Sequence, residues 1–297
     1  MTTGITPILR QVSRPYLSLA EFKNAPTALD YGNIVAGGTQ AAQDAELTNA
    51  ITRASSWIDQ YCNQIIGATL DVEQQRARIR PDGTIRFHPK YFPIVQLNSF
   101  TWKATPTDQA NSCDPSVAWI EEQQIVIPYA SSSPSMSSQG PLSFGFPYSN
   151  RAEVFINYSY VNGYANALST ASASAGATSI VVDNAVGILP GENLKIFDGA
   201  STENIQISSS YTLGSTTLQL ASPLQYAHSA GVSVSALPAA VKEAAILVTS
   251  AYLKIRGDAS LVLDVTNRPG QQIDGSQKVG SDIAHAQDLL LPFRRIR

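Results

Sequence analysis

The feature that most constrains the fold is a pair of helical patterns separated by a long stretch of strand-type sequence. In residues 39–65 the apolar side chains alternate at spacings of four and three: Leu47, Ile51, Ala54, Ile58, Tyr61 and Ile65. Residues 238–256 carry a second such stripe: Val241, Ala245, Val248, Tyr252 and Ile255. Each stripe is one apolar helix face that needs cover, so we expect the two flanks to fold together around one core.

Local signals predict where the helices begin and end. Ser18 followed three residues later by Glu21 fits a capping box for a short helix. Gly67 and Gly257 suit the ends of the two long helices. After a long connection over 258–280, Ser281 is a candidate cap for a last helix. The apolar side of that helix consists of Ile283, Ala286, Leu290 and Phe293.

Strand patterns fill residues 69–160. A polar strand over 69–80 and Thr84–Phe87 flank the turn Pro81-Asp82-Gly83, in which glycine supplies a positive φ. Further strands are predicted at 94–103, at 119–127 with a bend near Glu121, and at 153–160. Between the last two, residues 131–143 form a serine-rich, low-complexity loop.

From residue 165 to 235 the sequence changes character. This stretch contains no arginine and five charged residues, and short strand-like runs alternate with turn residues, as in a small all-β unit. It also contains a repeat: Gly176-Ala-Thr-Ser-Ile-Val-Val matches Gly214-Ser-Thr-Thr-Leu-Gln-Leu, and Pro190-Gly191 matches Ala230-Gly231 further on. Two similar halves are expected to close a small barrel or sandwich.

These patterns predict an α+β protein. Its first domain is discontinuous, comprising residues 1–164 and 236–297, and is helical with β-hairpin and sheet elements. Its second domain, residues 165–235, is an all-β insertion. Insertions of this kind are tolerated where the two ends of the inserted unit lie close together on a surface.

Composition excludes several classes of protein. Apolar residues make up 43% of the chain and charged residues only 14%, against roughly 25% in an average protein. With a net charge of −3, this composition excludes a typical disordered chain and argues against nucleic-acid binding by bulk charge. No stretch predicts a membrane span or a signal peptide. We expect a protein made in the cytoplasm, with Cys62 and Cys113 reduced.

A search for catalytic chemistry finds no candidate. The three histidines lie in separate segments, without metal-ligand spacing: His88, His228 and His285. Phosphate-binding loops and nucleophile elbows are absent. Asp71 with Glu73 could form a carboxylate pair, but solvated strand charges are the favoured interpretation. We therefore expect no enzymatic activity and no catalytic, cofactor-binding or metal-binding residues.

Two basic groupings have a functional interpretation. The first belongs to the predicted hairpin: Arg76, Arg78, Arg80 and Arg86. The first three alternate along one strand and share a face. They could contact DNA phosphates or an acidic partner, or form a solvated face paired with Asp71, Glu73 or Asp82. The sequence leaves both interpretations open.

The second basic grouping is at the C-terminus: Phe293, Arg294, Arg295, Ile296 and Arg297. Cations are favoured near the end of a helix because its dipole is negative there. The interleaved phenylalanine and isoleucine, however, favour a tail that docks in a groove of a partner.

Three segments of the flanks carry a family resemblance. They are Tyr16-Leu-Ser-Leu-Ala-Glu-Phe22, Ala54-Ser-Ser-Trp-Ile-Asp-Gln-Tyr-Cys62, and the run from Pro238-Ala-Ala-Val-Lys-Glu through Tyr252-Leu-Lys-Ile-Arg256. Over about 15–105 and 236–297 the chain resembles the head–tail connector, or adaptor, proteins of tailed bacteriophages. It is longer than typical members, because the strand-rich segments are additions.

The resemblance implies a structural role in the virion neck. Members form a ring, commonly a dodecamer, beneath the portal protein, and this ring continues the DNA channel toward the tail. The implied partners are the portal, a tail-side neck or tail-terminator protein, other copies of the chain, and DNA that passes without sequence-specific binding; a membrane is not among them. C-terminal segments of the family dock on the portal, which gives residues 293–297 that role here.

A second interpretation comes from a different class. The β unit over 165–235 could recognise a host glycan, which would make the protein a surface-binding module. Stacking on sugars needs exposed aromatic side chains. The unit offers three: Phe197, Tyr211 and Tyr226.

Overall fold

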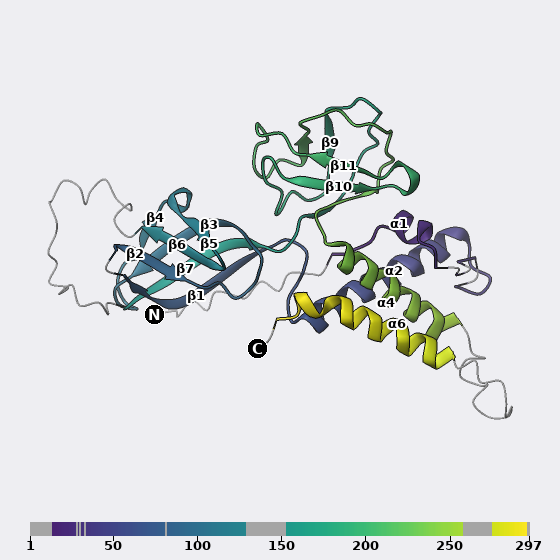
Figure 1. Ribbon diagram of the computed structural model, residues 1–297, viewed down its shortest axis with the longest axis horizontal. Helices are drawn as coiled ribbons and strands as arrows, with labels where there is room; N and C mark the ends of the chain where they lie inside the picture. The colour runs from purple at the N-terminus through teal and green to yellow at the C-terminus, as the bar shows by residue number, and fades with distance from the viewer. Residues whose placement is uncertain are drawn as a thin grey trace. The chain divides into compact units, whose positions relative to one another are not determined.

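A computed structural model describes residues 14–27, 29, 31–32, 34–80, 82–128, 153–257 and 275–295 (Figure 1). The described residues form two compact units: 68–163 in one, and 14–67 with 164–295 in the other. Helices and antiparallel sheets coexist, so the protein belongs to the α+β class, as predicted. The predicted division of the chain at 165 and 235 stays a prediction.

Four helices of the second unit share one apolar core: α1 (Leu19–Asn24), α2 (Gln40–Cys62), α4 (Ala239–Gly257) and α6 (Gly275–Leu290). Helices α4 and α6 lie side by side (Figure 1). The core joins segments that are far apart in sequence, because Leu47, Ile51 and Ile58 of α2 pack with Val241 and Val248 of α4. The expectation that the two apolar stripes meet is confirmed.

The ends of the helices follow from local chemistry. Ser18 and Glu21 form the predicted capping box of α1. Helix α2 ends earlier than predicted, because Asn63 adopts the left-handed conformation at φ 55°. Gly67 therefore does not end this helix. It lies close to Tyr16 instead, where a Cβ would be 3.4 Å from the aromatic ring. Helix α6 begins at Gly275, so the prediction that Ser281 caps it is wrong.

The first unit is a curled sheet of seven antiparallel strands (Figure 1). The strands are β1 (Thr69–Ile79), β2 (Thr84–Phe87), β3 (Ile94–Lys103), β4 (Asn111–Cys113), β5 (Trp119–Glu121), β6 (Gln124–Pro128) and β7 (Glu153–Asn162). Their order is β4-β3-β7-β1-β2-β6-β5. A 3-10 turn, η1 (Pro115–Val117), follows β4. We call this unit the large sheet.

The sequence predicts most strands of the large sheet. Gly83 has a φ of 74° in the hairpin turn, and Glu122 bends the chain between β5 and β6 at φ 53°, both as expected. Strand β4 was not predicted, because its three residues show no alternation of apolar and polar side chains. The serine-rich loop over 131–143, the residues before 14 and most of the 258–280 connection lie outside the described residues.

Residues 164–236, which we call the small β region, fold into short strands. These are β8 (Asn166–Leu168), β9 (Ser179–Val181), β10 (Asn193–Phe197), β11 (Glu203–Gln206), β12 (Thr217–Gln219) and β13 (Ser233–Ser235). Four of them form a sheet in the order β11-β10-β13-β8, and β9 pairs with β12. A 3-10 turn, η3 (Gly199–Ser201), joins β10 to β11. The two sheets share one aliphatic core.

The sequence repeat appears in the structure as an approximate internal two-fold symmetry. The two copies pair with each other, β9 with β12 around Ile180 and Leu218, and β10 with β13 around Lys195 and Ser235. Matching glycines, Gly176 at φ 84° and Gly214 at φ 80°, form matching turns.

The backbone hydrogen bonds repeat at the same interval as the sequence. The amide of Thr170 donates to Val181 O at 2.9 Å, and that of Ser208, 38 residues later, donates to Gln219 O at 2.8 Å. The isolated bridges Ser169–Val182 and Ile207–Leu220 match in the same way. The repeat found in the sequence is thus confirmed as two structurally equivalent copies.

Candidate functional site

The C-terminal segment lies against the end of α2. After η4 (Leu291–Phe293), the amide of Arg295 donates to the carbonyl of Cys62 at 2.9 Å. The side chains of Gln64 and Asn63 donate to the carbonyls of Phe293 and Arg295, at 2.9 and 3.2 Å. Five residues of this segment were predicted to dock on a partner; of these, Ile296 and Arg297 lie outside the described residues.

Phe293 has a partner within its own chain. Its ring meets that of Tyr164 edge-on, with centroids 6.4 Å apart, and it is partly buried against the helical core. The sequence argument held that an apolar residue near the chain end needs a surface to cover it. The structure provides such a surface inside this unit, through a contact between residues far apart in sequence.

Arg294 extends an aromatic stack on the surface of α2. The rings of Trp57 and Tyr61 lie 5.5 Å apart and nearly parallel, and the Arg294 guanidinium lies 5.2 Å from the centre of the Tyr61 ring. A guanidinium on an aromatic face keeps its donors free for a carboxylate or phosphate. Beneath the segment, burial raises the pKa of the Cys62 thiol to about 12, so this cysteine is an unreactive core residue.

The predicted basic face exists on β1. Arg76 and Arg78 alternate along the strand, Arg80 follows directly after its end, and all three are exposed. Arg76 lies 5.1 Å from the centre of the Phe155 ring, and Arg78 contacts Glu153 at 3.4 Å. This face belongs to the large sheet, whereas the C-terminal segment belongs to the other unit.

The carboxylate partners of the basic face differ from those expected. Arg86 pairs with Asp82 and with Glu121, each at 3.3 Å. Asp71 and Glu73 alternate with the arginines and therefore point to the opposite face of β1. Of the three carboxylates considered as partners for a solvated face, Asp82 pairs with Arg86, whereas Asp71 and Glu73 lie on the other face of β1.

Glu73 instead organises a hydrogen-bonded cluster on the inner face of the large sheet. It accepts bonds from the hydroxyls of Tyr158 at 2.8 Å and Tyr160 at 2.7 Å, and from the amide of Lys90 at 3.1 Å. Burial and the adjacent carboxylate raise the pKa of both tyrosines, so they stay protonated donors. The view of Glu73 as a solvated strand charge is therefore wrong.

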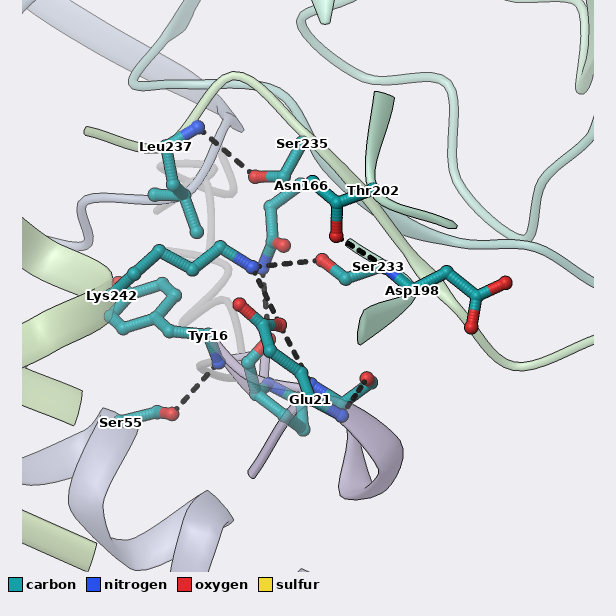
Figure 2. Close-up of polar contacts among 12 residues, drawn as sticks. Tyr16, Glu21, Ser55, Asn166, Asp198, Thr202, Ser233, Ser235, Leu237 and Lys242 are labelled. Atoms are coloured by element: carbon teal, nitrogen blue, oxygen red, sulfur yellow. Dashed lines mark hydrogen bonds and ion pairs between the residues drawn. The ribbon is translucent and has the colours of Figure 1, made fainter. Parts of the chain in front are cut away.

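A buried ion pair joins the small β region to the helices (Figure 2). Lys242 of α4 donates to Glu21 of α1 and to Ser233 of β13, each at 2.9 Å. The ammonium also lies 4.0 Å from the centre of the Phe197 ring. Burial lowers the pKa of Lys242 and raises that of Glu21, while each partner opposes the shift of the other.

The sequence carries one local signal for this ion pair. Lys242 follows Val241 at the start of an apolar stripe, where a charged residue needs a buried partner. Glu21 is also the acidic residue of the α1 capping box, so one carboxylate serves both roles. The partner itself lies 221 residues away and could not be read from local spacing.

The histidines show no metal-binding arrangement. Within the part of the chain that the structure describes, no group of three or more His, Cys, Asp or Glu residues is placed to hold a metal ion. Both cysteines are free and buried. Among the described helices, none is long and apolar enough to cross a membrane.

Comparison of the chain with protein-family models, with curated proteins and with solved structures finds no match.

Proposed function

We propose that this protein is a structural head–tail connector, or adaptor, of a tailed bacteriophage, without catalytic activity. In this proposal it forms a ring beneath the portal in the virion neck, continues the DNA channel toward the tail and presents the surface on which the tail assembles. It is built around a helical connector core, with the small β region inserted into it.

One observation carries the proposal. The three segments on which the family resemblance rests fold into one helical core, and this core places the C-terminal segment at the end of α2. There Arg294 is exposed on an aromatic stack. This arrangement supports docking of the C-terminal segment on a partner with carboxylates, for which we propose the portal.

The proposal is tested by mixing the full-length protein with its cognate portal and imaging the mixture by negative-stain electron microscopy. A second ring stacked on the portal is the expected result. Bare portals together with a monomeric protein would contradict the connector role.

Arg294→Gln tests the docking segment more sharply than truncation after Leu291, because truncation also removes the hydrogen bonds from Asn63 and Gln64. We expect weaker portal attachment with unchanged stability. Arg53→Gln, at an exposed arginine of α2, is the matched control and should attach normally. Equal attachment by both variants would refute docking through Arg294.

The arginine face of β1 supports a second part of the proposal, contact with the phosphates of DNA in the channel. Arg80 and the weakly paired Arg78 are exposed on this face. Replacing Arg76, Arg78 and Arg80 by glutamine should weaken non-specific DNA binding and flatten its salt dependence. A salt dependence unchanged from the wild type would remove DNA as the partner of this face.

The glycan-binding alternative draws less support from the same structure. Phe197 packs under Lys242, and Tyr211 is buried, with its hydroxyl bonded to the carbonyl of Ser215 at 2.6 Å. Of the three aromatic residues considered for stacking, Tyr226 is the one that remains exposed.

A further inference from the structure

The helices and the small β region have separate apolar cores. The helical core contains Leu47, Val241 and Val248, whereas the core of the small β region contains Ile196 and Val234. No described residue belongs to both clusters. Two layers of one domain normally share a core, so the small β region is held on the helices in a different way.

The larger sheet of the small β region has one aliphatic and one polar side. Ile196 of β10 pairs with Val234 of β13, and both belong to the aliphatic core. Because successive side chains of a strand point to opposite sides, their neighbours face away from that core. We call this second side the polar side; its residues are Asn166, Lys195, Phe197, Ser233 and Ser235. Figure 2 shows that it meets α1 and α4.

Lys242 is at the centre of the contact between the polar side and the helices. Its ammonium donates to Ser233 Oγ at 2.9 Å, lies 4.0 Å from the centre of the Phe197 ring and pairs with Glu21 at 2.9 Å. The side chains of Lys242 and Glu21 are only 5% and 11% exposed. Burying two charges carries a desolvation cost that offsets much of their attraction. This contact therefore stabilises the docked arrangement less than an apolar contact of the same size would.

The remaining contacts across this boundary are polar as well. The Asn166 side chain donates to the carbonyl of Pro15, which precedes α1, at 3.0 Å. Arg14 forms an ion pair with Asp183 of the small β region, and both side chains are partly exposed. Polar contacts are typical of interfaces between domains that move relative to each other.

Separation of the two parts would leave no polar group without a partner. Water can replace each lost bond of Ser233, Asn166 and Lys242, because all of them would become accessible to solvent. The aliphatic core would stay covered by the strands that enclose it. Of the residues on the polar side, Phe197 would be the one that exposes an aromatic ring.

The chain enters and leaves the small β region at a single place. The amide of Ala236 donates to the carbonyl of Ala165 at 2.9 Å, and Ser235 Oγ donates to the same carbonyl at 3.0 Å. The amide of Leu237 donates in turn to Ser235 Oγ at 3.0 Å. Two connections that lie side by side form one pivot, about which a domain turns without breaking its internal hydrogen bonds.

We propose that the small β region undocks from the helices as a rigid body that turns on the paired connections at Ala165 and Ala236. In the docked state, Lys242 joins Ser233 to Glu21. In the undocked state these groups are hydrated, and the polar side faces water. Undocking moves the small β region without disturbing the helical core that carries the C-terminal segment. The proposal does not depend on the connector role.

The first test measures the distance between the two parts in the full-length protein by pulsed electron paramagnetic resonance. Spin labels are attached at the exposed positions Gln60→Cys of α2 and Thr217→Cys of β12, since both native cysteines are buried. Ser233→Ala removes the bond from Lys242. The population away from the docked distance should rise about tenfold, the effect of losing one hydrogen bond to a charged group.

A second variant and a matched control complete this measurement. Asn166→Ala removes the bond to Pro15 and should act in the same direction; an unchanged distance distribution in both variants would overturn the proposal. Ser169→Ala is the control, because Ser169 Oγ is buried but bonds only within the small β region, to Ser229 and Val232. It should leave the distances as in the wild type. An equal change in the control would refute a specific role for the boundary.

Amide hydrogen exchange separates undocking from unfolding. In Ser233→Ala, strands β10 and β13 should keep their protection, because a rigid body retains its internal hydrogen bonds. Loss of protection over both strands would show that the region unfolds instead, and would overturn the proposal. Neither measurement involves the portal, so failure of the connector role leaves this inference intact.

Discussion

The large sheet and the small β region reach stability by different routes. Strands β1, β3 and β7 of the large sheet have 10 or 11 residues, and its core is rich in aromatic rings, including Phe87, Phe100 and Tyr158. The strands of the small β region have three to five residues around an aliphatic core. We expect the large sheet to depend mainly on the packing of its aromatic side chains, and the small β region to depend on its turns and on its contacts with the helices.

In the small β region, the helices provide this support. The buried pair of Lys242 and Glu21, with Ser233, connects its sheet to α1 and α4. The comparison therefore predicts that the large sheet is most sensitive to loss of aromatic volume, and the small β region to loss of a buried charge or a turn glycine.

The largest effect is expected from Phe100→Ala in the large sheet. Phe100 is buried and packs on Phe87 with ring centroids 5.5 Å apart, so truncation should cost about 3–5 kcal/mol. Hydrogen exchange of β3 and β7 measures the loss locally. Phe155→Ala, on the outer face of β7, is the control and should cost much less. Equal losses would mean that the inner aromatic cluster does not dominate this sheet.

In the other unit, breaking the buried ion pair should lower the free energy of unfolding about as much as Phe100→Ala does in the large sheet. Glu21→Ala leaves the Lys242 ammonium buried without its carboxylate, at a cost of about 3–5 kcal/mol. The double variant Glu21→Leu with Lys242→Met should recover most of that loss, because it removes both charges. Denaturant unfolding monitored at α4 separates the two outcomes. A double variant as unstable as the single one would show that packing, not charge, holds this contact.

The turn glycines should give intermediate and matched effects. Gly176 and Gly214 both have φ near +80° and open space around them, so alanine introduces backbone strain without a clash. We expect about 1–2 kcal/mol for each substitution. Two equal losses of stability would show that the two turns are energetically equivalent, with the exposed Ser174→Ala as the control. A large difference between the two losses would mean that the two turns share a backbone conformation but contribute unequally to stability.

The smallest effect concerns the turn of the large sheet. The hydroxyl and amide of Thr84 donate to Asp82 at 2.6 and 2.9 Å and, with Arg86, lower its pKa. Since the folded pKa lies below the unfolded one, Asp82 stabilises the fold at neutral pH and loses this effect as the pH falls. The unfolding midpoints of wild type and Asp82→Asn should differ by a constant amount at neutral pH and converge as the pH falls below about 4, the ordinary pKa of aspartate. A difference that persists unchanged at that low pH would contradict this assignment.

Local periodicity predicted most of the elements. The capping box at Ser18, the apolar stripe of α2, the alternation along β1 and β7 and the repeat of the small β region all appear in the structure. Strands β4 and β8 were missed, because Asn111–Cys113 and Asn166–Leu168 contain none of the β-branched or aromatic residues that mark a strand. The end of α2 at Asn63 was missed, because a left-handed asparagine is a weaker signal than glycine.

The candidate sites were likewise predicted only where they depend on local spacing. The exposed arginine face of β1 follows directly from alternation. Three other contacts join segments that are distant in sequence. They are the ion pair of Arg78 with Glu153, the packing of Arg294 on the Tyr61 ring, and the hydrogen bonds of Tyr160 to Glu73. Spacing within one strand or helix cannot identify such partners.

The sequence by itself determined the helical stripes, the faces of β1 and the two copies of the repeat, because each depends on the geometry of a few neighbouring residues. Only the tertiary structure decided which charges are buried and with what partners. Lys242 meets Glu21 across 221 residues, and the His228 ring lies between the carboxylates of Asp198 and Glu203. A buried charge is set by the whole packing around it, which no local pattern encodes.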